Sequence, residues 1–130
     1  MTKVAILGFG TVGSGVAEVL SKNSQGIARR SGGEIQVKYI LDVRDFPDSP
    51  FKDCFVKDFS IIENDPEVDV VVETIGGAKV ALEFTTRALK AGKSVVSSNK
   101  ELVATHGYEL LQLAMANGVS YLFEASVGGG

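Results

Sequence analysis

The amino-acid sequence predicts an α/β fold, in which helices cover a doubly wound, mainly parallel sheet of about six strands. Short apolar runs rich in β-branched residues alternate along the chain with longer stretches of helical periodicity. One of these runs, Val68–Glu73, reads VDVVVE and suits a central parallel strand. The first run leads straight into three closely spaced glycines, which indicates a tight turn between a strand and a helix. A length of 130 residues fits one domain with a core of its own.

The first strand is expected over Lys3–Leu7, and the glycines after it have G-x-G-x-x-G spacing. Gly8 would permit the sharp turn out of the strand, Gly10 would let a pyrophosphate approach the backbone, and Gly13 would let a helix pack closely on the strand. That helix is expected over Thr11–Asn23, and its N-terminus would offer free N–H groups and partial positive charge to phosphates. The stretch therefore predicts a Rossmann-type dinucleotide site.

The second strand, Ile35–Leu41, ends beside two charged residues of opposite sign. Asp42 stands where the acidic residue of the fingerprint accepts hydrogen bonds from the adenosine ribose hydroxyls. Arg44 offers the alternative of pairing with the 2′-phosphate of NADP, which a guanidinium fits well. A polar strand end without a ligand is the third interpretation. Before this strand, Ser24–Glu34 is rich in Gly, Ser and Arg and is expected to form an extended loop.

The remaining elements follow from apolar periodicity and from the prolines and glycines between them. Residues 46–59 contain two prolines and are expected to be irregular, apart from a short strand at 55–56. The elements expected after these are a helical turn over Ser60–Asn64, strands over Val68–Glu73, Ser94–Ser97 and Ser120–Phe123, and helices over Ala78–Ala91 and Thr105–Asn117. The glycines at residues 128–130 read as an interrupted loop, so the chain is interpreted as part of a longer protein.

The composition argues against several classes of function. A net charge of −3 with scattered basic residues gives no broad surface for nucleic acid or for an anionic membrane. No apolar run approaches the ~20 residues of a membrane span, and no secretory signal precedes the first strand, so we expect a soluble, cytoplasmic protein. The single cysteine, Cys54, excludes an internal disulfide and is interpreted as structural rather than nucleophilic.

Three segments are expected to meet where the strands end, namely Phe9–Gly13, Glu73–Gly77 and Ser97–Lys100. Their motifs are G-F-G-T-V-G at 8–13, E-T-I-G-G at 73–77 and S-S-N-K at 97–100, followed by E-A-S-V-G-G-G at 124–130. Together these motifs make the chain resemble homoserine dehydrogenase over essentially its whole length. The resemblance implies that residues 1–130 are the nucleotide-binding domain and that the substrate domain lies beyond Gly130.

The fingerprint and the resemblance together define the expected site. Lys100 matches the family's lysine beside the reacting carbon, so it is the implied catalytic residue. The resemblance also implies that Glu124, Val127 and Gly129 hold a monovalent cation, usually sodium, through their backbone carbonyls. The expected cofactor contacts are Gly8, Phe9, Gly10, Thr11, Val12, Gly13, Asp42, Arg44, Lys57, Thr74, Ser97, Ser98 and Lys100.

The resemblance implies the interconversion of L-homoserine and L-aspartate 4-semialdehyde with NADP or NAD, on the pathway to threonine and methionine. The full-length enzyme is expected to be a homodimer that takes homoserine as its small-molecule substrate. Two alternatives remain open. Another dehydrogenase of this fold would oxidise a semialdehyde with a cysteine beyond Gly130, whereas a nucleotide-sensing regulatory module would have no use for a lysine aimed at the nicotinamide.

Overall fold

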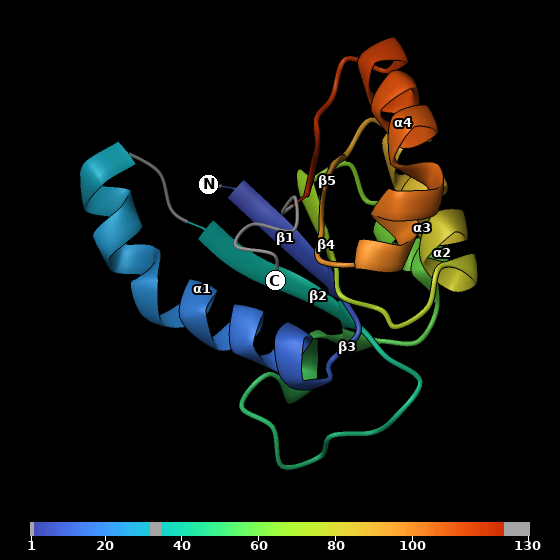
Figure 1. The fold of residues 1–130 in the computed structure, drawn as a ribbon. Coiled ribbons are helices and arrows are strands. Elements are labelled where there is room, and N and C mark those ends of the chain that lie inside the picture. The colour runs from blue at the N-terminus through green and yellow to red at the C-terminus, as the bar shows by residue number, and fades with distance from the viewer. Residues whose placement is uncertain (1, 32–34, 124–130) are drawn as a thin grey trace.

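A six-stranded, all-parallel sheet forms the centre of the protein, with the strand order β3-β2-β1-β4-β5-β6 (Figure 1). The structure is a computed structural model that describes residues 2–31 and 35–123, and only the backbone of residues 23–31. The chain begins in the middle of the sheet, continues to one edge, and then returns to build the other half. This order is the doubly wound arrangement that the sequence predicts.

The six strands end level with one another at their carboxyl ends. The strands are β1 (Thr2–Leu7), β2 (Ile35–Leu41), β3 (Phe55–Val56), β4 (Val70–Glu73), β5 (Ser94–Ser97) and β6 (Tyr121–Phe123). Their final residues are paired across the sheet, in the row Val56, Leu41, Leu7, Glu73, Ser97 and Phe123. Every turn that leaves this row therefore begins at the same edge, where open parallel sheets bind their ligands.

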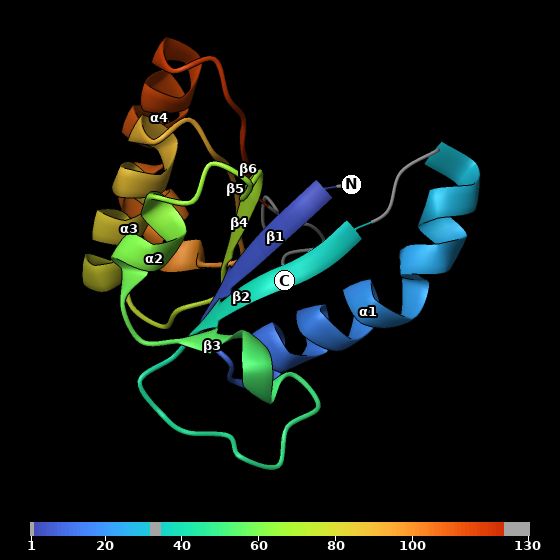
Figure 2. The same cartoon turned by 180° about the vertical axis from the view of Figure 1, so that it is seen from behind.

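Helices cover both faces of the sheet (Figures 1 and 2). The helix α1 (Thr11–Ser31) packs on one face, where Ala17 joins Val4, Ile6 and Ile40 in a buried cluster. The helices α2 (Phe59–Glu63), α3 (Lys79–Lys90) and α4 (Lys100–Ala116) cover the other face, and a short 3-10 turn, η1 (Lys52–Cys54), precedes β3. Successive side chains of a strand point in opposite directions, so Val4 and Ile6 of β1 pack on the face with α1, and Ala5 and Leu7 pack on the other face.

Two helix boundaries differ from the sequence prediction. The loop predicted over Ser24–Glu34 is wrong as far as Ser31, because α1 continues to that residue, and residues 32–34 lie outside the described part of the chain. Glycine and serine in this stretch favour a loop, but a single glycine costs a helix only about 1 kcal/mol, and the alanine and arginines that follow favour the helix. The second correction concerns α4, which begins at Lys100 rather than Thr105, because the Asn99 side chain caps it. The other elements agree with prediction to within two residues at each end.

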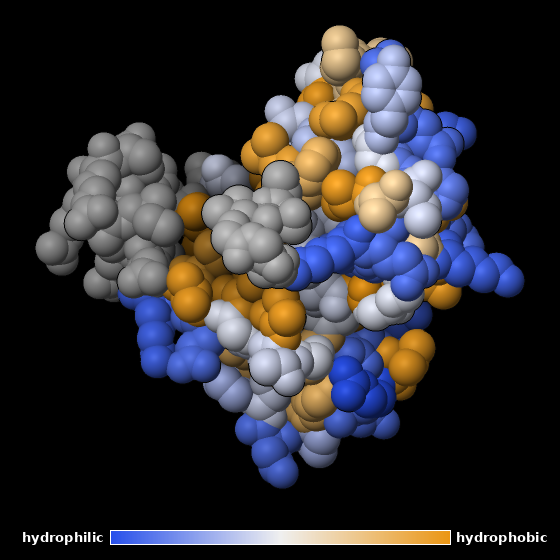
Figure 3. Space-filling model, in the orientation of Figure 1, coloured by the Kyte–Doolittle hydropathy of each residue, from blue (hydrophilic) through white to orange (hydrophobic). Residues whose placement is uncertain are grey.

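Apolar side chains are also found at the surface on the face that carries α1. In Figure 3 they gather between this helix and the strands behind it. Of the described helices, α1 alone packs on this face, over β1 and β2. Val96 of β5 and Leu122 of β6 are exposed by 37% and 59%. No helix among the described residues is both long and apolar enough to cross a membrane.

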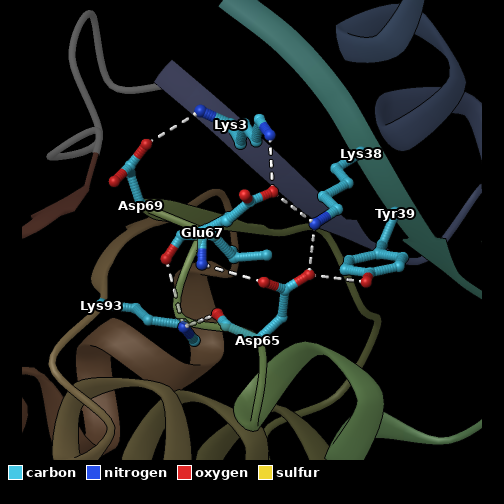
Figure 4. Close-up of polar contacts among 8 residues, drawn as sticks. Lys3, Lys38, Tyr39, Asp65, Glu67, Asp69 and Lys93 are labelled. Atoms are coloured by element: carbon cyan, nitrogen blue, oxygen red, sulfur yellow. Dashed lines mark hydrogen bonds and ion pairs between the residues drawn. The ribbon is translucent and has the colours of Figure 1, made fainter. Parts of the chain in front are cut away.

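A polar network joins the segments at the amino ends of the strands, away from the glycine turn (Figure 4). Asp65 accepts hydrogen bonds from Lys38 at 2.5 Å and from the Tyr39 hydroxyl at 2.6 Å. The buried Lys93 ammonium donates to the backbone carbonyls of Asp65 and Val68 at 2.6 and 3.1 Å. Lys3, Glu67 and Asp69 complete the network. These contacts fix the segment before β4 to β1, to β2 and to the start of β5. The glycine turn lies at the other edge of the sheet, where the strands end.

Candidate functional site

The glycine turn after β1 is packed too tightly for any larger residue at its third glycine. A Cβ on Gly13 would lie 2.0 Å from the carbonyl oxygen of Gly8. Gly8 itself has φ +93°, a conformation that favours glycine, and its N–H donates to the Leu41 carbonyl at 2.7 Å. At Gly10, in contrast, an added Cβ would meet nothing within 4 Å. The turn thus holds α1 close to β1 and leaves open space at the glycine that should face a pyrophosphate.

Thr74 joins the turn after β4 to the glycine turn. Its hydroxyl lies 2.7 Å from the Leu7 carbonyl oxygen and 3.1 Å from that of Gly8, and its N–H donates to the Leu7 carbonyl at 3.0 Å. These contacts bind the carbonyl oxygens of Leu7, at the end of β1, and of Gly8, in the glycine turn. The two turns are therefore held in a fixed position relative to each other. The helix α1 begins in this glycine turn at Thr11, and a helix leaves its first N–H groups without partners of its own.

Asp42 and Arg44 bind each other at the end of β2. The carboxylate of Asp42 accepts from the Arg44 N–H, Nε and Nη2 at 2.8, 3.0 and 2.9 Å, and from the Phe9 N–H at 2.8 Å. The hydrogen bonds from the Arg44 side chain hold the pKa of Asp42 well below its usual value, so the carboxylate stays ionised. Arg44 keeps 60% of its side chain exposed and lies over the Phe46 ring. The charge of Asp42 is therefore compensated within the chain.

A cleft of about 430 Å³ lies among these turns. Its charged rim is formed by Asp42, Arg44 and Lys57, and an apolar wall is formed by Val80 and Phe84 of α3. Lys57 pairs with Asp45 at 2.8 Å and donates to the Val43 carbonyl at 2.9 Å. An apolar wall suits a flat base and a charged rim suits a ribose or phosphate, so the cleft fits the adenosine half of a dinucleotide.

A larger cleft, of about 840 Å³, lies between α1 and the segment 45–51. Of the predicted site residues, only Phe9 lines it. This cleft therefore stands apart from the turns after β4 and β5, and size alone does not identify the functional site.

The turns after β4 and β5 form the second part of the site. The Ser97 hydroxyl donates to the Glu73 carboxylate at 2.7 Å, and Ser97 is only 3% exposed. This contact leaves little of the Ser97 side chain for a cofactor. Ser98 is exposed, and its N–H and hydroxyl both bind the Glu73 carbonyl oxygen, at 3.0 and 3.2 Å. The Asn99 amide donates to the Ile75 and Gly77 carbonyls at 2.8 and 2.5 Å.

Lys100 begins α4 at this edge and is exposed. Its side chain forms no hydrogen bond or ion pair with any other residue that the structure describes. The ammonium group is therefore available to a ligand placed over the ends of β4 and β5. The predicted cation ligands Glu124, Val127 and Gly129 lie outside the described residues, and the part of the chain that is described holds no cluster of metal-binding side chains.

Two residues that shape this edge were not predicted from the sequence. Asn99 belongs to the S-S-N-K motif, and its position just before a helix with Glu101 in the first turn is an N-cap signal. Glu73 ends the strand predicted over Val68–Glu73, and it is completely buried. A carboxylate at the end of a buried, β-branched strand needs a hydrogen-bond partner, but only the structure shows that this partner is Ser97.

Comparison with known proteins gives one consistent family. A family profile described as "Homoserine dehydrogenase, NAD binding domain" matches residues 8–124. The chain is 45% identical to homoserine dehydrogenase of Pseudomonas aeruginosa, over 98% of this chain and 30% of that protein. It is 42% identical to the enzyme of Corynebacterium glutamicum, over 97% of this chain and 29% of that protein.

Solved structures give the same result. A crystal structure of S. aureus homoserine dehydrogenase at pH 7.5 superposes with a TM-score of 0.89 and 38% identity, covering 99% of this chain and 33% of that one. A homoserine dehydrogenase from Thiobacillus denitrificans has a TM-score of 0.83 and 38% identity, covering 95% of this chain and 29% of that chain. The chain thus spans about a third of the length of the proteins that it matches.

Proposed function

We propose, because this chain belongs to the family of homoserine dehydrogenase NAD-binding domains, that it forms the NAD(P)-binding part of an enzyme interconverting L-homoserine and L-aspartate 4-semialdehyde. The whole enzyme would act in the cytoplasm as a homodimer. Its substrate-binding groups would come from the part of the protein beyond Gly130. A sodium ion bound by carbonyls of Glu124, Val127 and Gly129 belongs to the same proposal.

One observation carries the proposal: the turns after β1, β4 and β5 are bonded to one another at a single edge of the sheet. Thr74 reaches the carbonyls of Leu7 and Gly8, and Asn99 reaches those of Ile75 and Gly77. A dinucleotide laid along this edge would have its adenosine in the cleft beside Asp42, its pyrophosphate over Gly10, and its nicotinamide toward Lys100. The open space at Gly10 supports that placement.

The residues of this chain would bind the cofactor, orient it and handle one proton. When bound, the nicotinamide supplies hydride exchange with the carbon that bears the homoserine hydroxyl. Lys100 would accept the hydroxyl proton at a neutral Nζ during oxidation, and as an ammonium it would donate that proton to the aldehyde oxygen in the reverse direction. Thr74 and Ser98 would hold the edges of the nicotinamide half.

The proposal is tested by comparing this chain with the longer gene product that contains it. Isothermal titration calorimetry of residues 1–130 is expected to show binding of NADP or NAD, because the glycine turn and the cleft lie within them. The chain alone should not reduce cofactor when homoserine is added, whereas the longer protein should.

Turnover by residues 1–130 alone would contradict the idea that the substrate groups lie elsewhere. A longer protein that oxidises a semialdehyde but not homoserine would be the other kind of dehydrogenase. Cofactor binding with neither activity would indicate a sensing module.

Arg44 is expected to set the preference between the two cofactors. Its exposed guanidinium can leave Asp42 and pair with a 2′-phosphate, which NADP has and NAD lacks. In Arg44→Ala, the affinity for NADP should fall by roughly 10-fold or more, as expected when a charge-assisted hydrogen bond is lost. The affinity for NAD should change much less. Calorimetric titration with each cofactor makes the comparison, and equal losses would mean that Arg44 does not reach the phosphate.

A further inference from the structure

We propose that Glu73 is a positioning residue that fastens the turn after β4 to the turn after β5 and thereby sets the place of Lys100. The inference rests on the proposed function for the role of Lys100, but the contacts of Glu73 stand independently of it. Glu73 does not reach the open face of the site, since it is completely buried.

Both oxygens of the Glu73 carboxylate are used, each by a different turn. Oε2 accepts from the Ile75 N–H at 2.7 Å, in the turn that leads to α3. Oε1 accepts from the Ser97 hydroxyl at 2.7 Å, and the Ser97 oxygen in turn accepts from the Asn99 N–H at 3.2 Å. One carboxylate is thus connected to the backbone of both turns through a short chain of hydrogen bonds.

The second end of this chain lies directly before Lys100. The Asn99 side chain caps α4 by accepting from the Leu102 N–H at 3.0 Å, and its amide nitrogen binds the Ile75 and Gly77 carbonyls. The cap therefore fixes the first turn of α4, in which Lys100 is the first residue. If Glu73 no longer held Ser97, the Asn99 backbone would lose its acceptor and the start of α4 would be free to shift.

Among the residues that the structure describes, no positive side chain near Glu73 explains a buried carboxylate. Burial raises the pKa of Glu73, and the hydrogen bonds from Ser97, Ile75 and Asn99 lower it. Among the described residues, the buried Tyr121 hydroxyl of β6 also lies near this carboxylate and near the Ser97 hydroxyl. A buried carboxylate without a counter-ion is unfavourable. What it provides here is two acceptor oxygens at the point where two turns must be joined.

The test uses the longer enzyme that contains this chain and compares Glu73→Ala with Glu73→Gln. Amide hydrogen exchange, followed by mass spectrometry, is measured for peptides covering residues 74–78 and 97–102. Glu73→Ala should raise exchange in both peptides together, by roughly 10-fold or more, because both N–H groups lose their fixed acceptors. Glu73→Gln should restore most of the protection, since an amide can accept from Ile75 and donate to the Ser97 oxygen. Thr85→Val is the matched control, because it removes a buried hydroxyl on α3 that has no hydrogen-bond partner among the described residues.

Steady-state kinetics give the second measurement. A displacement of Lys100 by about 1 Å is expected to lower kcat for homoserine roughly 10- to 100-fold in Glu73→Ala. The KM for the cofactor should change less than kcat, since the charged rim of the cleft (Asp42, Arg44 and Lys57) lies outside the two turns that Glu73 joins. Glu73→Gln should recover most of kcat. The proposal would be overturned if Glu73→Ala showed wild-type exchange in both peptides and an unchanged kcat. It would also be overturned if Glu73→Gln showed wild-type exchange but kept a low kcat.

The two proposals fail in distinguishable ways. A wild-type enzyme that does not oxidise homoserine would remove the proposed function, while the exchange measurement would still decide whether Glu73 joins the two turns. If Glu73→Ala does not fold, the amide variant answers the question alone. It must then keep protection in both peptides for the proposal to stand.

Discussion

Replacing Lys100 with alanine in the longer enzyme is expected to lower kcat by about 10²- to 10⁴-fold, the usual contribution of a positioned acid–base group. Oxidation of homoserine removes a proton from the hydroxyl while the hydride leaves the carbon, so a group must receive that proton. Lys100 is exposed at the edge where the turns after β4 and β5 meet, and the described residues leave its side chain unpaired. The affinity for NADP should change much less than kcat.

The environment that the substrate brings would make this proton transfer feasible. An ammonium group has no lone pair, so Lys100 can accept the hydroxyl proton only as the neutral amine. Exclusion of water, or a second positive charge from the substrate domain, would favour the neutral amine. Lys90→Ala is the matched control, because Lys90 is an exposed lysine at the far end of α3. If Lys100→Ala keeps its kcat and loses only cofactor affinity, Lys100 is a binding residue and the acid–base role is wrong.

Replacing Gly13 with alanine should have the largest effect on the fold. The added Cβ would be placed 2.0 Å from the Gly8 carbonyl oxygen and 2.9 Å from the Thr74 hydroxyl. The nearest atoms belong to the Gly8 backbone, and the Thr74 hydroxyl is held by the Leu7 and Gly8 carbonyl oxygens, so neither can easily move away. We expect a loss of at least ~1–3 kcal/mol in the free energy of unfolding, the usual range for overpacking. Cofactor binding should be lost as well.

Two nearby glycines separate crowding from the general effects of adding a methyl group. Gly15→Ala is on the same helix, and its Cβ would meet nothing within 4 Å. This variant should gain up to about 1 kcal/mol, because alanine favours a helix over glycine. Gly10→Ala should keep its stability but lose cofactor affinity, since its methyl group would enter the space that a pyrophosphate needs. Urea denaturation and calorimetry measure both quantities, and a stable Gly13→Ala variant would contradict the close packing.

The glycine turn could be predicted from the sequence because each glycine has a local role: a positive φ at Gly8, open space at Gly10 and close packing at Gly13. The end of β2 shows where such reasoning stops. The pattern of charges offers Asp42 and Arg44 as alternative cofactor contacts, yet they bind each other through three hydrogen bonds. One of these bonds comes from the Arg44 N–H at a bend of the backbone after β2, and the pattern of charges does not record that bend.

The contacts of Glu73 illustrate a second limit. Periodicity identifies β4 and β5 separately, but it does not say that Glu73 is level with Ser97, 24 residues later in the chain. Register comes from packing across the sheet, not from local propensity. The start of α4 was misplaced for the opposite reason. The capping signal at Asn99 is local and present in the sequence, whereas the apolar periodicity of the helix becomes clear only later in the chain.

The central position of β1 affects how the protein can be assembled during synthesis. The strand leaves the ribosome before the other five strands of the sheet, and β2 can pair with one of its edges as soon as α1 has formed. Its other edge must wait for β4, whose Val70 pairs with Val4. Until then an apolar strand has open hydrogen-bonding groups along one side, a state that favours pairing with the wrong chain. Such long-range parallel pairings also slow folding. The nascent first half would therefore benefit from protection by a chaperone until β4 has been made.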